Sequence, residues 1–115
     1  MPDSLSSSAH GARLERRAAR HYRLRGYRVL GTNVWSAGYE LDLIVRRGRR
    51  LVFCEVKGKT GFGLGDPLEM VDPEKLRRLE RAAEVWLAHN PACLELDCRF
   101  EVVAVRPGGL ERVAV

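Results

Sequence analysis

The sequence predicts a mixed α/β domain in which a mixed β-sheet is flanked by helices. Two segments show the 3.6-residue spacing of apolar side chains that is typical of amphipathic helices. Five other segments are short, apolar and bounded by turn residues, as strands are. Their order along the chain, α-β-β-β-α-β-β, excludes a helix bundle and a pure β-sandwich.

The first predicted helix runs from Ala9 to Arg25 and begins the folded part of the chain. We expect residues 1–10 to be a disordered polar tail and residues 11–115 to form a single domain. The buried face of the helix carries apolar residues four apart: Leu14, Ala18 and Tyr22. Five arginines lie on the opposite face: Arg13, Arg16, Arg17, Arg20 and Arg23.

Strands are predicted for residues 27–35, 39–46, 50–57, 94–106 and 110–115. The first two are joined by a turn at residues 36–38, and the next two by a tight turn at Arg47–Gly48. A glycine-rich loop at residues 58–66 follows the third strand. The second helix begins at Asp72, an N-cap aspartate followed by a proline, and ends near Asn90.

The net charge of +5 favours an anionic partner, with nucleic acid ahead of a membrane. No apolar stretch approaches the roughly 18 residues that a membrane span requires. Because no secretory signal begins the chain, we expect a cytoplasmic protein. The cysteines, Cys54, Cys93 and Cys98, fit neither a disulfide framework nor a zinc site, so we interpret them as reduced thiols, mostly in the core.

Two predicted strands carry charged residues inside apolar runs. Glu40 and Asp42 lie two residues apart in the second strand. Glu55 and Lys57 lie two residues apart in the third strand. Since alternate residues of a strand share a face, each pair lies on one face of its strand.

The turn between these strands decides whether both pairs share the same face. A two-residue turn at Arg47–Gly48 pairs Arg46 with Arg49, which places Asp42 diagonally beside Glu55 on one face. A four-residue turn preserves that face, whereas a three-residue turn would send Glu55 to the other side.

Close carboxylates in a buried strand repel one another and lose hydration, so a lysine or a cation has to neutralise them. Their hard oxygen atoms suit Mg²⁺ or Mn²⁺, with Asp42, Glu55 and Glu40 as candidate ligands. Lys57 could then orient a water molecule and stabilise the transition state of phosphodiester cleavage. The alternative is that Glu55 and Lys57 lie on a solvated edge strand and that the acids pair with surface arginines.

Glu15 is a further candidate ligand, on the first helix. No basic residue stands three or four positions away, and Glu15 borders the apolar face. It therefore either leans toward the sheet and joins the carboxylates or pairs with an arginine elsewhere.

The motif ELDLI at 40–44, followed by EVK at 55–57, resembles the PD-(D/E)xK, or restriction-endonuclease-like, nuclease superfamily. A wider set resembles the YraN-like family of small uncharacterised bacterial proteins, which are similar to archaeal Holliday junction resolvases. The set comprises GARLE at 11–15, GY at 26–27, Asn33, LVFCEVKGK at 51–59, FG at 62–63, Lys75 and RFEVV at 99–103. The sequence departs from the usual patterns at GYELDLI, EVKGK and RFEVV, and none of these departures removes a candidate ligand.

The resemblance implies a restriction-endonuclease-like αβββαβ core. It also implies that Asp42 and Glu55 bind Mg²⁺, that Lys57 assists catalysis and that Glu15 often joins the site. Junction resolvases tend to form homodimers, so self-association is a further expectation.

The function predicted from the sequence is a Mg²⁺-dependent endonuclease acting on DNA, including branched or nicked forms. Basic residues are the candidates for contacts with backbone phosphates: Arg13, Arg16, Arg17, Arg20, Lys59 and Lys75. One alternative is a non-catalytic nucleic-acid-binding protein on a nuclease scaffold. Another is an interaction protein whose acidic cluster has no chemical role.

Overall fold

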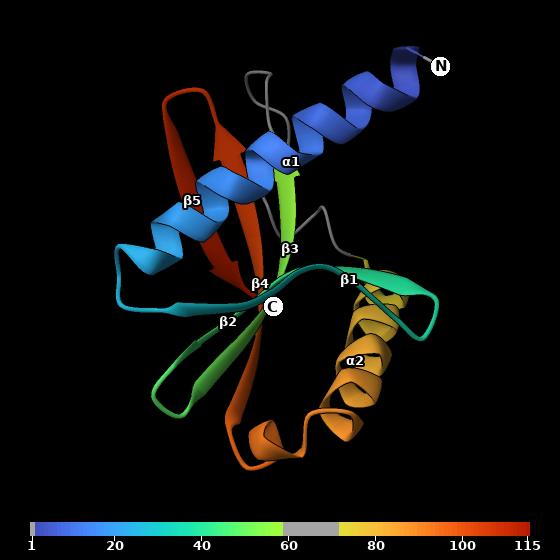
Figure 1. Ribbon diagram of the computed structural model, residues 1–115, viewed down its shortest axis with the longest axis vertical. Helices are drawn as coiled ribbons and strands as arrows, with labels where there is room; N and C mark the ends of the chain where they lie inside the picture. The colour runs from blue at the N-terminus through green and yellow to red at the C-terminus, as the bar shows by residue number, and fades with distance from the viewer. Residues whose placement is uncertain (1, 59–71) are drawn as a thin grey trace.

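The computed structural model describes residues 2–58 and 72–115, with side chains from residue 11 onward (Figure 1). Its elements are α1 (Pro2–Arg23), β1 (Arg28–Ser36), β2 (Tyr39–Arg47), β3 (Arg50–Gly58), α2 (Pro73–Ala88), the 3₁₀ helix η2 (Pro91–Cys93), β4 (Asp97–Arg106) and β5 (Gly109–Ala114). This order confirms the predicted mixed α/β class with an αβββαβ-type core. Among the helices so described, none is long and apolar enough to cross a membrane.

The five strands form one sheet in the order β1-β2-β3-β4-β5. Strands β3 and β4 are parallel, and the other neighbouring strands are antiparallel. The connection from β3 to β4 therefore has to cross over the sheet, and α2 lies within that crossover. The third strand is consequently central and has neighbours on both sides.

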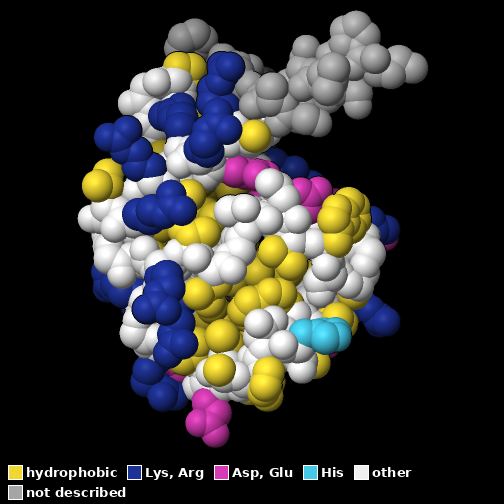
Figure 2. All heavy atoms as spheres, viewed as in Figure 1, with side chains coloured by type: hydrophobic (Ala, Val, Ile, Leu, Met, Phe, Trp, Pro, Cys, Tyr) yellow, Lys and Arg dark blue, Asp and Glu magenta, His cyan; other side chains and the backbone are white. Residues whose placement is uncertain are grey.

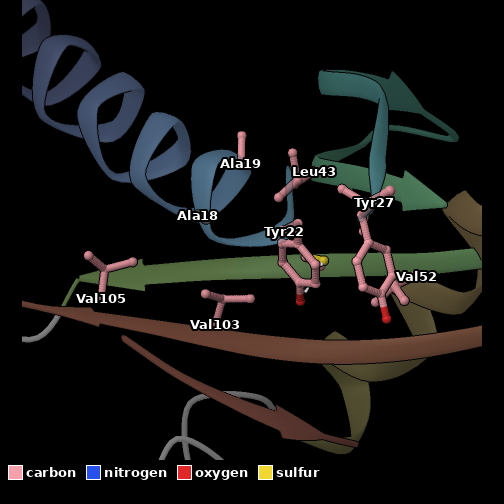
Figure 3. Packing of buried hydrophobic residues seen from close by; sticks show 10 residues of the cluster. Ala18, Ala19, Tyr22, Tyr27, Leu43, Val52, Val103 and Val105 are labelled. Atoms are coloured by element: carbon pink, nitrogen blue, oxygen red, sulfur yellow. Dashed lines mark hydrogen bonds between the residues drawn. The ribbon is translucent and has the colours of Figure 1, made fainter. Parts of the chain in front are cut away.

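The two helices pack on opposite faces of the sheet, so the molecule has two apolar cores. Val52 and Cys54 of β3 belong to the core under α1. Leu51 and Phe53, which alternate with them, belong to the core under α2. Figure 3 shows the α1 side, where Tyr22 from the helix and Tyr27 from the following segment point their rings into the sheet.

The start of α1 differs from the prediction. The helix begins at Pro2, so residues 2–10, which the sequence assigned to a disordered tail, continue the helix. The only proline of this segment stands at the first helical position, where its missing N–H costs no hydrogen bond. The polar composition of residues 2–10 therefore did not indicate where α1 begins.

The turn between β2 and β3 also lies one residue later than predicted. Arg47 pairs with Arg50 rather than Arg46 with Arg49, and the turn residues are Gly48 and Arg49. Gly48 has a φ of 59° at the first central position, as a type II′ hairpin turn requires. The register moves by two residues, which preserves the faces of both strands.

The start of β4 lies at Asp97, three residues after the predicted Leu94, because residues 94–96 form a turn after η2. Of the three cysteines, all free thiols, Cys54 and Cys93 are buried and Cys98 is exposed. The prediction that they are mostly core residues is confirmed.

A buried ionic network joins α1 to strands β4 and β5. Glu101 of β4, only 9% exposed, accepts hydrogen bonds from Nε and Nη2 of Arg112 at 3.0 and 3.2 Å. It also accepts a hydrogen bond from the hydroxyl of Tyr22, whose ring lies 4.5 Å from the Arg112 guanidinium. The paired charges are satisfied, so the network fixes the edge strand β5 against α1.

We predict that Glu101→Ala lowers the free energy of unfolding by about 3 kcal/mol, because the Arg112 guanidinium and the Tyr22 hydroxyl lose their buried acceptor. Glu111→Ala removes an exposed pair with Arg106 and should cost less than about 1 kcal/mol. Urea denaturation followed by circular dichroism measures both changes. Equal losses for the two variants would contradict this role of Glu101.

Candidate functional site

Strands β2 and β3 part near Asp42. Their pairing runs from Arg47 and Arg50 to Leu43 and Cys54, where it stops although both strands continue. Beyond that point the Asp42 carboxylate accepts the Val56 N–H at 2.9 Å, in place of a ladder hydrogen bond. The carboxylate is thereby held between the two strands.

The alternation of side chains along β2 also changes at Asp42. Leu41 packs into the core under α2, whereas Leu43, two residues on, packs into the core under α1. Across the hairpin, Asn33 of β1 has a left-handed φ of 51°. The β1–β2 ribbon turns over at this place, so side chains from both faces of the sheet come close to Asp42.

Three carboxylates converge there and form what we call the acidic triad: Glu15, Glu40 and Asp42. One oxygen of each lies within 4.8 Å of the others, and all three side chains are partly buried. Glu15 leans from α1 toward the sheet, the first of the two arrangements that its sequence context left open. Hard carboxylate oxygens at this spacing fit Mg²⁺ or Mn²⁺, with water or phosphate oxygens completing the coordination.

The electrostatics of the acidic triad disfavour full ionisation. Burial raises the pKa of Asp42 to about 7, and the negative charges of Glu55, Glu15 and Glu40 add to the shift. Burial and Glu40 also raise the pKa of Glu15, against the opposing effect of a hydrogen bond with Asn33. A cation bound between these carboxylates would favour their charged forms.

Glu55 lies next to the acidic triad but on the α2 side. Its Oε1 is 3.1 Å from the Lys57 ammonium and 3.8 Å from that of Lys75, and its Oε2 accepts a hydrogen bond from the Tyr39 hydroxyl at 3.1 Å. Glu55 is not among the three carboxylates whose oxygens lie within 4.8 Å of one another. Glu55 nevertheless lies close enough to raise the pKa of Asp42.

The alternative of a solvated edge strand is wrong. Glu55 is 5% exposed, and β3 is flanked by β2 and β4. Burial lowers the pKa of Lys57, but its contacts with Lys75 and Glu55 outweigh burial and hold that pKa above its ordinary value. Contact with Lys57, followed by burial, lowers the pKa of Lys75.

Some residues of the site were missed or given another role by sequence reasoning. Lys75 was expected to bind nucleic acid, yet it reaches Glu55 from the first turn of α2. Tyr39 was missed because simple alternation places it on the face opposite Glu55. Trp35, which is 70% exposed and directly opposite Glu40 in the β1–β2 register, was not considered either.

The predicted phosphate-binding residues of α1 lie on its exposed face: Arg13, Arg16, Arg17 and Arg20. Arg17 also donates a hydrogen bond to the Arg106 carbonyl oxygen at 2.9 Å. Lys59 and the rest of the glycine-rich loop after Gly58 fall outside the described residues. Figure 2 shows basic side chains over α1 and along one edge of the molecule, with acidic side chains grouped beside the helix.

Comparison with known proteins agrees with the resemblance seen in the sequence. The model of the uncharacterised protein family UPF0102, the YraN-like family, matches residues 14–105. A UPF0102 protein of Magnetococcus marinus is 39% identical over 88% of this chain and 82% of its own length. One from Pseudomonas entomophila is 38% identical over 95% of this chain and 88% of its own length. Neither of these names states an activity.

We predict that Asp42 makes stability depend on pH and on divalent metal. Its folded pKa of about 7 lies above the ordinary 3.8, so the folded state favours the protonated form. Without metal, stability should fall by roughly 2–4 kcal/mol as the pH rises from about 4 to about 7, and this loss should be absent in Asp42→Asn.

Thermal unfolding at pH 8 with and without Mg²⁺ tests the same residue as a ligand. Mg²⁺ should raise the unfolding temperature of the unmodified protein and not that of Asp42→Asn. Glu74→Gln, which alters an exposed pair on α2, serves as the matched control and should keep the full metal effect. An equal rise in all three proteins would exclude Asp42 as a ligand.

Proposed function

We propose that this chain, which belongs to the uncharacterised protein family UPF0102, is a Mg²⁺- or Mn²⁺-dependent endonuclease that hydrolyses phosphodiester bonds in DNA. The observation that carries the proposal is the acidic triad next to the Glu55–Lys57 pair. Carboxylates for a metal and an ammonium group beside them are the groups that phosphodiester hydrolysis needs.

Glu15, Glu40 and Asp42 are the residues that would hold the metal. When bound, the ion would lower the pKa of a water molecule and neutralise charge on the phosphate oxygens. The Val56 N–H fixes the Asp42 carboxylate, so this ligand requires little rearrangement. Partial burial of all three side chains strengthens their attraction for a divalent cation relative to exposed carboxylates.

Lys57 is the residue we assign to the reacting phosphate. Its ammonium is held 3.1 Å from Glu55, which is itself anchored by the Tyr39 hydroxyl. From this position Lys57 can orient the attacking water and stabilise negative charge that develops on the phosphate in the transition state. Lys75 adds a second positive charge on the same side.

Nucleic acid is the substrate class that the charge and the surface support. The chain has a net charge of +5, and the arginines of α1 are exposed. The exposed indole of Trp35, opposite Glu40, offers a surface on which an unpaired base could stack, which suits branched or nicked DNA. In the cytoplasm, where we place the protein, such DNA is accessible.

We predict that Lys57→Ala and Asp42→Ala each reduce Mg²⁺-dependent cleavage by at least about 100-fold. Labelled duplex, nicked and four-way junction DNA, incubated with Mg²⁺ or Mn²⁺ and separated on denaturing gels, measure cleavage. Arg78→Ala removes a positive charge from an exposed pair of α2 and should leave cleavage unchanged.

Binding of the same DNA in Ca²⁺ separates catalysis from recognition. Lys57→Ala should bind with nearly the affinity of the unmodified protein while failing to cut. If the unmodified protein binds DNA and cuts none of these substrates, the nuclease proposal fails and the non-catalytic binding alternative replaces it.

A further inference from the structure

A pocket lined by arginines lies at the opposite end of β2 from the acidic triad. It is found between the α1–β1 junction and the β2–β3 turn and has a volume of about 370 Å³. We call it the arginine pocket, and its lining residues are Gly26, Arg28, Arg46, Arg47 and Gly48. None of them takes part in the catalytic site proposed above.

Arginines face one another across the strands at this place. Arg28 is directly opposite Arg46 in the β1–β2 pair, and Arg47 is directly opposite Arg50 in the β2–β3 pair. Like charges in directly opposed positions destabilise a sheet. Within residues 11–58 and 72–115, none of these four arginines forms an ion pair. A bound anion would relieve this repulsion.

The guanidinium groups of the pocket are held in place by the backbone. Arg46 donates from Nε to the Gly48 carbonyl oxygen at 2.9 Å, and Arg47 donates from Nη1 to the Arg25 carbonyl oxygen at 3.0 Å. The Arg47 guanidinium also lies 5.2 Å from the ring centroid of Tyr27. Each arginine has five N–H donors, so these contacts leave further donors for a ligand. Oriented guanidinium groups are well suited to the oxygens of a phosphate.

We propose that the arginine pocket binds a backbone phosphate of nucleic acid at a distance from the bond that is cut. The distance between this phosphate and the cut bond rests on the proposed nuclease function, whereas the binding of a phosphate in the pocket does not. Four to six residues of β2 and its turn separate Asp42 from the pocket, which corresponds to roughly 13–20 Å. With a rise of about 3.4 Å per base pair, the bound phosphate lies about four to six base pairs from the reacting one.

A nucleic-acid backbone fits this surface better than a small phosphorylated molecule does. Basic side chains continue along the same edge of the molecule from α1 to the β2–β3 turn (Figure 2). Regularly spaced phosphates can contact such a band at several points, whereas a single phosphate uses only one. The arginine pocket is then the end of a track that begins near the acidic triad.

The double variant Arg28→Ala/Arg46→Ala tests the pocket, because both side chains line it and their removal also relieves the like-charge contact. The matched control is Arg77→Ala/Arg81→Ala, which removes the same charge from two exposed positions of α2, on the other face of the sheet. Fluorescence anisotropy with a duplex of about 20 base pairs, in Ca²⁺ and over a series of salt concentrations, measures affinity without cleavage.

The pocket variant should bind about tenfold or more weakly than the unmodified protein, with the slope of log K against log salt reduced by about one, as expected for the loss of one phosphate contact. The control should retain both the affinity and the slope. Equal losses in the two variants would show an effect of net charge alone and would overturn the inference. Unchanged binding by the pocket variant would overturn it as well and would direct attention to an acidic protein partner.

A cleavage arm tests the predicted spacing. Substrates whose duplex is shortened on either side of the cut bond should lose cleavage once fewer than about four to six base pairs remain on one side. The pocket variant should lose this length requirement. Absence of cleavage would contradict the proposed function and this spacing, whereas the anisotropy comparison would still decide whether the pocket binds DNA.

Discussion

The candidate site is governed by the repulsion among the carboxylates that lie where β2 and β3 separate. Glu15, Glu40 and Asp42 come within 4.8 Å of one another, and Glu55 lies close enough to raise the pKa of Asp42. Such a cluster destabilises a protein unless protons or cations neutralise it. Lys57 and Lys75 lie beside Glu55, and the acidic triad is the part for which we propose a divalent ion.

The fold supports this cluster from both faces of the sheet. Glu15 comes from α1 and Lys75 from α2, and the two meet the strands because Asp42 stands where the β1–β2 ribbon turns over. The buried pair of Glu101 and Arg112, on the α1 side, uses similar chemistry for a different purpose. Its charges are already satisfied within the protein, so it stabilises the fold and needs no ligand.

The order of the elements could be predicted from the sequence because apolar spacing and turn residues are local signals. The placement of side chains around Asp42 could be predicted only in part. Alternation along a regular strand foresees neither the left-handed conformation of Asn33 nor the hydrogen bond from Tyr39 to Glu55. The contact of Lys75 with Glu55 depends on how α2 packs across the sheet, which no local pattern of the sequence encodes.

X-ray diffraction from crystals soaked in Mn²⁺, with data collected at the manganese absorption edge, tests the central claim most directly. We predict an anomalous peak about 2.1 Å from carboxylate oxygens of Glu15, Glu40 and Asp42. A map with no peak at these residues, or with a lysine ammonium seated between their carboxylates, would contradict it.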